Sequence, residues 1–157
     1  MRKLTLIALL ALLTVTVVQA QREQDFASRF MSLYGEDAAL SCNTVSPTMM
    51  GRIVPLTNDS LPALRQVLSQ IKSIRVVMPT AETHMPDLMD KAEQLALNNR
   101  RRYKPYAETE GRSIYLRKRG KYVVEFVMIA GKSPNDFAVV SITGNMTESF
   151  FSELMKI

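Results

Sequence analysis

The last third of the chain carries the feature that most restricts its fold, because strand-like runs follow one another there with only short connections. The runs are Lys104 to Thr109, Ser113 to Arg119, Tyr122 to Ala130 and Phe137 to Thr143. The three connections between them are short and polar, and each contains a glycine. Parallel neighbours need a crossover of about a dozen residues or more, whereas short connections of this kind join antiparallel strands. This region therefore predicts an antiparallel meander.

The pattern inside these runs indicates which strands are covered. Ile114 and Leu116 alternate with more polar residues, as in a strand with one face in water. The run from Tyr122 to Ile129 is apolar at almost every position, and Glu125 is its one charged residue. A run that is apolar on both faces predicts a central strand.

Helical periodicity surrounds this sheet-forming region. Apolar residues recur at three- and four-residue steps in four stretches, which are 26–34, 61–71, 85–96 and 150–155. Weaker strand signals lie at Ser41 to Val45 and Ile74 to Met78. This order predicts an α+β domain in two layers, an antiparallel-dominated sheet with helices packed on one face.

The N-terminus has the pattern of a cleavable export signal. Arg2 and Lys3 precede an uncharged apolar run over residues 4–18, and small residues stand at Val18 and Ala20. The run is about fifteen residues long, shorter than the roughly twenty that span a bilayer. We expect residues 1–20 to be removed, leaving one domain over 21–157 with no transmembrane segment. The expected location is periplasmic or secreted.

The net charge after this cleavage is small. Removing Arg2 and Lys3 lowers the count of Lys and Arg from 20 to 18 against 15 acidic residues, a net charge of +3. That excess does not predict a nucleic-acid partner. Cys42 is the one cysteine, so the sequence predicts no internal disulfide.

Catalytic motifs with recognisable spacing are missing from the sequence. His84 is the one histidine and precedes a helix within Thr83-His84-Met85-Pro86, so a serine triad is not expected. We expect no enzyme activity and no cofactor. A hydrolase remains as an alternative, because a pair of carboxylates can come together in space without a sequence motif.

A second alternative is a periplasmic carrier of Cu(I) or another metal. Met78, His84, Met85 and Met89 fall within twelve residues. Thioether and imidazole ligands suit Cu(I). Methionine also fills irregular cores, and Met85 and Met89 lie on the apolar stripe of a predicted helix, which favours packing over a metal site.

Two basic segments suggest a binding surface. The candidate residues are Arg100, Arg101, Arg102, Lys104, Arg117 and Arg119. If the hairpin folds back beside the end of the third helix, these side chains form one positive patch. Such a patch suits an acidic envelope protein, a glycan or a lipid headgroup. A solvated face near the helix C-terminus is the alternative explanation.

Three short motifs also resemble a known family. They are Val45-Ser46-Pro47-Thr48-Met49-Met50, Ile71-Lys72-Ser73-Ile74-Arg75-Val76 and Phe137-Ala138-Val139-Val140-Ser141-Ile142-Thr143-Gly144. The chain is similar there to an uncharacterised secreted family of Bacteroidetes-type bacteria, domain of unknown function 4252. The resemblance covers nearly all of residues 21–157 and implies an envelope setting in a Gram-negative bacterium. It implies no catalytic residues.

The resemblance makes one modification site worth naming. Asp59-Ser60-Leu61 fits the pattern at which periplasmic glycoproteins of such bacteria are modified, and Ser60 would carry the sugar. Ser60 is equally suited to cap the helix that follows. From these observations the sequence predicts an exported, non-catalytic binding or interaction module.

Overall fold

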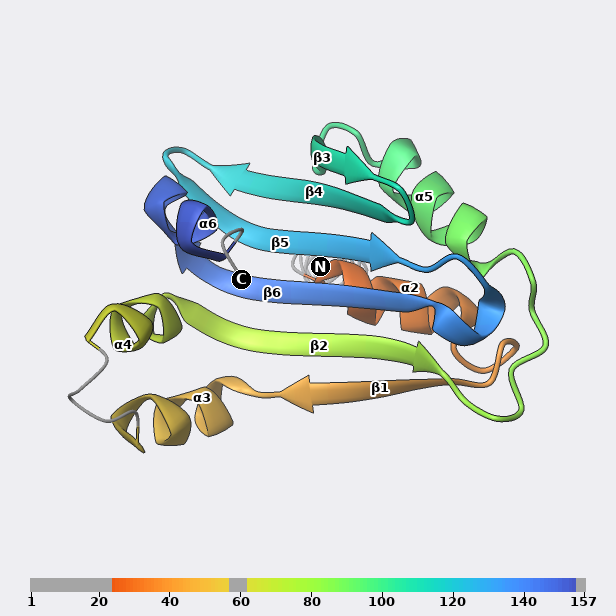
Figure 1. The fold of residues 1–157 in the computed structure, drawn as a ribbon, viewed down its shortest axis with the longest axis horizontal. Helices are drawn as coiled ribbons and strands as arrows, with labels where there is room; N and C mark the ends of the chain where they lie inside the picture. Colours follow the sequence, from red (N-terminus) through yellow and green to blue (C-terminus); the bar gives the residue numbers. More distant parts are fainter. Residues whose placement is uncertain (1–23, 57–61, 155–157) are drawn as a thin grey trace, which may run out of the picture.

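The computed structural model describes residues 24–56 and 62–154, and its centre is a six-stranded antiparallel sheet (Figure 1). The strand order is β1-β2-β6-β5-β4-β3. The strands are β1 (Leu40–Val45), β2 (Ile71–Pro79), β3 (Lys104–Thr109), β4 (Arg112–Arg119), β5 (Tyr122–Ala130) and β6 (Ala138–Met146). The predicted meander is therefore confirmed, with β5 in an interior position.

The pairing of β2 with β6 joins the early strands to the meander. Its register sets Val76 opposite Val140, and the two strands stay paired as far as Gly144. A Cβ atom at Gly144 would lie 2.0 Å from the carbonyl oxygen of Gln70, so a larger residue does not fit between the strands. The glycine therefore permits the close approach at which β6 meets the start of β2.

Four of the five helices in the described residues, all except α3, follow the predicted stretches with shifted ends. The helices are α2 (Phe26–Tyr34), α3 (Pro47–Ile53), α4 (Pro62–Ser69), α5 (Leu88–Asn98) and α6 (Glu148–Leu154), with 3-10 turns η1 (Val54–Leu56) and η2 (Pro134–Asp136). The largest shift is at the start of α5. Thr83 lies in the turn before this helix, where its hydroxyl donates to the carbonyl of Ala39 and accepts the N–H of Thr80.

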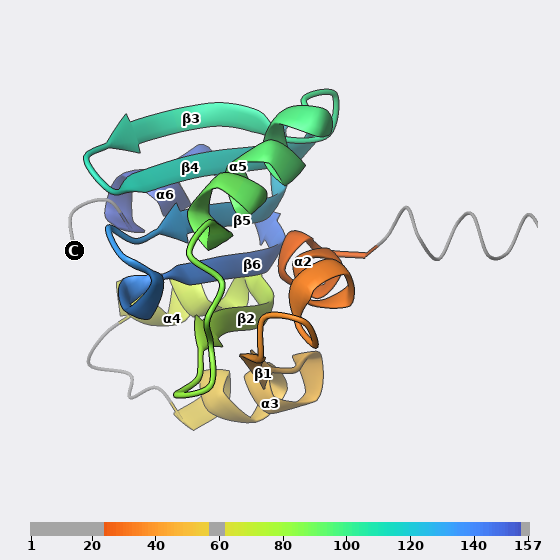
Figure 2. The same cartoon turned by 90° about the vertical axis from the view of Figure 1, so that its right-hand side faces the viewer.

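The helices cover both faces of the sheet, and here the sequence prediction needs correction. One core holds the apolar sides of α2 and α5 against residues such as Val127 and Val139. A second core holds Phe150 and Phe151 of α6, with Val67 of α4, against the other face of the same strands. Figure 2 shows α2 on one side of the sheet and α4 and α6 on the other. The α+β class and the antiparallel sheet are confirmed, but helices packed on a single face are not.

The physical reason lies in the central strands. In β5, Val127 and Ile129 belong to the first core, while Phe126 and Met128 contact the second. A strand that is apolar on both faces must be covered on both faces to remove that surface from water.

Within residues 24–56 and 62–154, no helix is long and apolar enough to cross a membrane. The predicted signal segment, residues 1–20, and Ser60 lie outside the described residues.

A polar groove beside the start of α2

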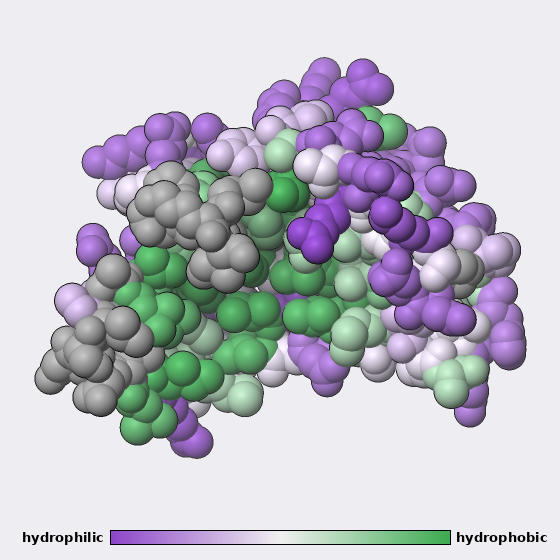
Figure 3. All heavy atoms as spheres, viewed as in Figure 1, coloured by the Kyte–Doolittle hydropathy of each residue, from purple (hydrophilic) through white to green (hydrophobic). Residues whose placement is uncertain are grey.

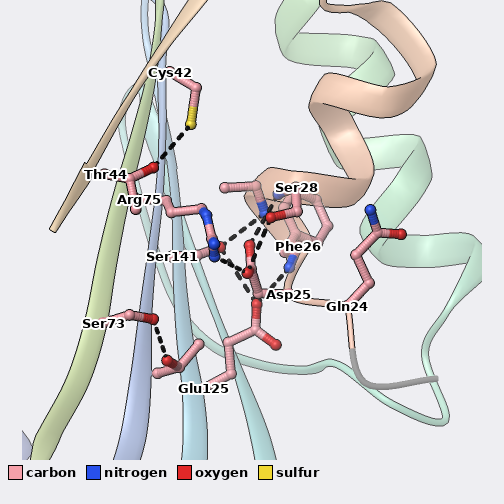
Figure 4. Close-up of polar contacts among 12 residues, drawn as sticks. Gln24, Asp25, Phe26, Ser28, Cys42, Thr44, Ser73, Arg75, Glu125 and Ser141 are labelled. Carbon is pink, nitrogen blue, oxygen red and sulfur yellow. Dashed lines mark hydrogen bonds and ion pairs between the residues drawn. The ribbon is translucent and has the colours of Figure 1, made fainter. Parts of the chain in front are cut away.

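The first turn of α2 is held by three side-chain acceptors. The N–H groups of Phe26, Ala27 and Ser28 donate to Glu125 Oε1 at 2.6 Å, Ser141 Oγ at 2.9 Å and Asp25 Oδ1 at 2.9 Å. A helix leaves its first N–H groups without partners inside the helix, so these contacts satisfy them. Figure 4 shows the acceptors converging on the start of the helix from the sheet and from residue 25 itself.

Glu125 is the centre of this arrangement, and its side chain is fully buried. Its second oxygen, Oε2, accepts from Tyr103 Oη at 3.1 Å and from Arg117 Nε at 2.9 Å. Burial raises the pKa of Glu125, while the Phe26 N–H and the Arg117 guanidinium act to lower it. The carboxyl group is thus fully engaged in fixing α2 against the sheet.

A second ion pair lies next to the first. Arg75 of β2 donates to Asp25, whose side chain is largely buried, and Asp25 also accepts from the Ser28 hydroxyl. On the same face of the sheet, the hydroxyl groups of Ser73 and Thr143 contact each other. Polar residues therefore replace apolar ones where α2 begins, and beyond this point the helix no longer covers the sheet.

A groove of about 930 Å³ occupies this uncovered part. Its walls come from the sheet and from α3 with η1. The sheet contributes Ser73, Thr143, Arg117 and Arg119, and the helical segment contributes Met50, Gly51, Val54 and Pro55. The size is in the range typical of ligand pockets.

The charge of the groove is positive. Its described lining includes Lys72, Arg117 and Arg119 against one carboxylate, Asp25. Asp25 is paired with Arg75, and Arg117 is paired with Glu125. Of the lining residues that the structure describes, Lys72 and Arg119 are the cations in no ion pair, so they are open to an anionic ligand.

Two of the six basic residues predicted as one patch line the groove. They are Arg117 and Arg119. Arg102 instead donates to the carbonyl of Gln24 at 2.6 Å and lies over the Tyr103 ring, so it fixes the chain before α2. The remaining members, Arg100, Arg101 and Lys104, are exposed and do not line the groove.

The four residues proposed for a metal are not brought together. Met85 and Met89 pack against the core of the α2 and α5 face. Met78 alternates along β2 with Val77, which belongs to that core, so it lies on the other face of the sheet. His84 is exposed. Within the described residues, there is also no cluster of three or more His, Cys, Asp or Glu side chains that could hold a metal ion.

A carboxylate pair does form in space, between Asp25 and Glu125, but its geometry does not suit hydrolysis. Glu125 is inaccessible to a ligand, and both of its oxygens accept hydrogen bonds from the protein. A general acid or base must lie within hydrogen-bond reach of the substrate. The pair therefore holds α2 in place.

Sequence reasoning missed Asp25, Arg75 and Ser141 in this cluster. Glu125 gave a signal, as the one charged residue of an otherwise apolar central strand. Asp25 gave no such signal, because the hydrogen bond beside it, from Phe26 to Glu125, joins residues that are 99 positions apart in the sequence.

Comparison with protein-family models identifies the family of this chain. The model described as domain of unknown function (DUF4252) matches residues 34–154, so the chain belongs to this family. No curated protein and no solved structure matches it. The matched range contains the groove lining apart from Asp25.

Proposed function

We propose that this member of the DUF4252 family is an exported, non-catalytic binding module that holds an anionic ligand in the groove. The observation that carries this proposal is the position of Arg119 and Lys72, two lining cations in no ion pair with another described residue. The N-terminal pattern of residues 1–20 supports export to the envelope of a Bacteroidetes-type bacterium.

The chemistry of the lining supports an anion with an apolar part. Arginine presents planar N–H donors that match carboxylate or phosphate oxygens. The hydroxyl groups of Ser73 and Thr143 lie nearby, while Met50, Val54 and Pro55 offer an apolar wall. No aromatic side chain is among the described lining residues, so a platform for stacking sugar rings is missing there.

The test is a ¹⁵N chemical-shift titration with inorganic phosphate. We expect saturable shifts at the amides of Ser73, Thr143 and Asn145, and we expect Arg119→Ala to abolish them. Arg101→Ala is the matched control, since Arg101 is also exposed but lies outside the groove. Shifts that cluster at residues 100–104, or that depend on Arg101, would show that the loop rather than the groove binds anions.

A further inference from the structure

The helical segment between β1 and β2 carries exposed apolar side chains on α3 and η1, and one more on α4. Met49, Ile53 and Leu56 follow one another at four- and three-residue steps and are 47%, 39% and 82% exposed, and Leu64 of α4 is 42% exposed. We name Met49, Ile53 and Leu56 the apolar stripe. Figure 3 shows apolar surface gathered over α3 and α4, whereas hydrophilic surface dominates the opposite end of this view.

The same segment forms one wall of the groove. Met50 and Val54, each one position after a stripe residue, line the groove. The segment thus carries an apolar wall of a cationic groove on one side and exposed apolar side chains on another. A partner of the stripe would therefore bind the same helical segment that forms one wall of the groove.

The charges around the stripe are almost all positive. Between Ser46 and Thr80 the sequence holds Arg52, Arg65, Lys72 and Arg75 against a single carboxylate, Asp59, and of these cations Arg75 is paired with Asp25. Arg52 is exposed in the last turn of α3, directly before Ile53, and Lys72 is exposed in the groove lining. A second copy of the chain would bring the same cations to the same surface, so this charge disfavours self-association.

The geometry points to the surface of an anionic lipid bilayer as the partner of the apolar stripe. Protruding aliphatic side chains insert into fluid acyl chains without needing a matching pocket, and Leu56 is more than four-fifths exposed. Neighbouring arginine and lysine residues then meet the lipid phosphates. The inference rests on the proposed function in one respect, because it identifies the anion of the groove as a lipid headgroup.

Vesicle flotation tests this inference, with the protein purified from the cells that produce it and used without further truncation. One set of vesicles contains phosphatidylglycerol and phosphatidylcholine, and the other contains phosphatidylcholine alone. We expect binding to the anionic set, weakened by salt. The double variant Ile53→Ser, Leu56→Ser should bind those vesicles at least about tenfold more weakly, because burying each aliphatic side chain is worth about a tenfold change or more.

The matched control is Leu33→Ser, Leu97→Ser, which removes two side chains that are 50% and 39% exposed on α2 and α5. Equal weakening by both double variants would overturn the inference, because binding would then not depend on the stripe. Equal binding to both sets of vesicles would overturn the role of charge. A change of oligomeric state in the Ile53→Ser, Leu56→Ser protein, seen by size-exclusion chromatography with light scattering, would assign the stripe to a second copy instead.

The phosphate titration separates the two proposals. If the unaltered protein shows the phosphate shifts but does not bind vesicles, the lipid surface is refuted and the groove proposal stands. If the unaltered protein shows neither phosphate shifts nor vesicle binding, both proposals are refuted. Vesicle binding that requires the stripe but survives Arg119→Ala would place the lipid contact at the stripe alone, which overturns the link to the groove.

Discussion

Replacing Glu125 by leucine should remove the contact that fixes α2 to the sheet. The substitution keeps the side-chain size close to that of glutamate but leaves the Phe26 N–H, the Tyr103 hydroxyl and the Arg117 guanidinium without their acceptor. Breaking a buried ion pair by removing one partner costs about 3–5 kcal/mol. We expect a loss of about that size in the free energy of unfolding, since Glu125 is fully buried.

Urea unfolding followed by circular dichroism measures the effect, with the free energy extrapolated to water. Met128→Leu is the matched control, a swap of similar volume in the same strand, and we expect it to cost less than about 1.5 kcal/mol. A loss below about 1 kcal/mol for Glu125→Leu would refute the assigned role of the carboxylate. Adding Arg117→Met should recover part of the loss, because the guanidinium then no longer lacks a partner.

Three further predictions follow from particular residues. Burial raises the pKa of Glu125 above its ordinary value of 4.5, so the folded state binds the carboxyl proton more tightly than the unfolded state does. The free energy of unfolding should therefore fall as pH rises from about 4.5 through the raised pKa. Urea midpoints across this range should show the fall, and Glu125→Gln should remove it. Gly144→Ala should destabilise by about 2 kcal/mol or more in thermal unfolding, because its Cβ would meet Gln70 O at 2.0 Å, whereas Gly51→Ala, with no atom within 4 Å, should stabilise α3 by about 0.5–1 kcal/mol. Intact-mass measurement of the exported protein should show a chain that starts after Ala20, and a retained N-terminus would contradict the predicted signal cleavage.

Strand identity was predictable because it depends on local alternation and on short connections. The runs from 104 to 143 match β3 to β6 to within a few residues at each end. Strand order was not predictable to the same degree, since the pairing of β2 with β6 joins segments about 70 residues apart. Such a pairing depends on packing across the whole sheet.

The start of α5 illustrates how local chemistry competes with periodicity. Apolar spacing predicted a helix from Met85, but the helix begins at Leu88. Pro86 disfavours helical backbone at the residue before it, and Thr83 is already used in the turn that contacts Ala39. At the start of the helix, Asp87 and Lys91 form an ion pair, with 2.9 Å between the charged atoms.

Only part of the groove could be predicted, because its residues come from six separate segments. Arg117 and Arg119 were identified as a basic pair on one strand, where residues two apart share a face. Arg100 and Arg101, predicted as part of the same patch, are not among the described residues that line the groove. The hydroxyl groups of Ser73 and Thr143 gave no sequence signal, as single serine and threonine residues in strands rarely do.

The start of α2 couples the stability of the fold to the chemistry of the groove. Asp25 caps the helix, pairs with Arg75 and lines the groove, while Arg117 both lines the groove and compensates the buried Glu125. A substitution at either residue would change the helix anchor and the groove together, so loss of binding there would not identify a ligand contact. Arg119 is exposed and forms no ion pair with another described residue, so its replacement changes the charge of the groove and leaves the anchor intact. A binding defect in Arg119→Ala at unchanged stability is therefore the result that separates ligand recognition from folding.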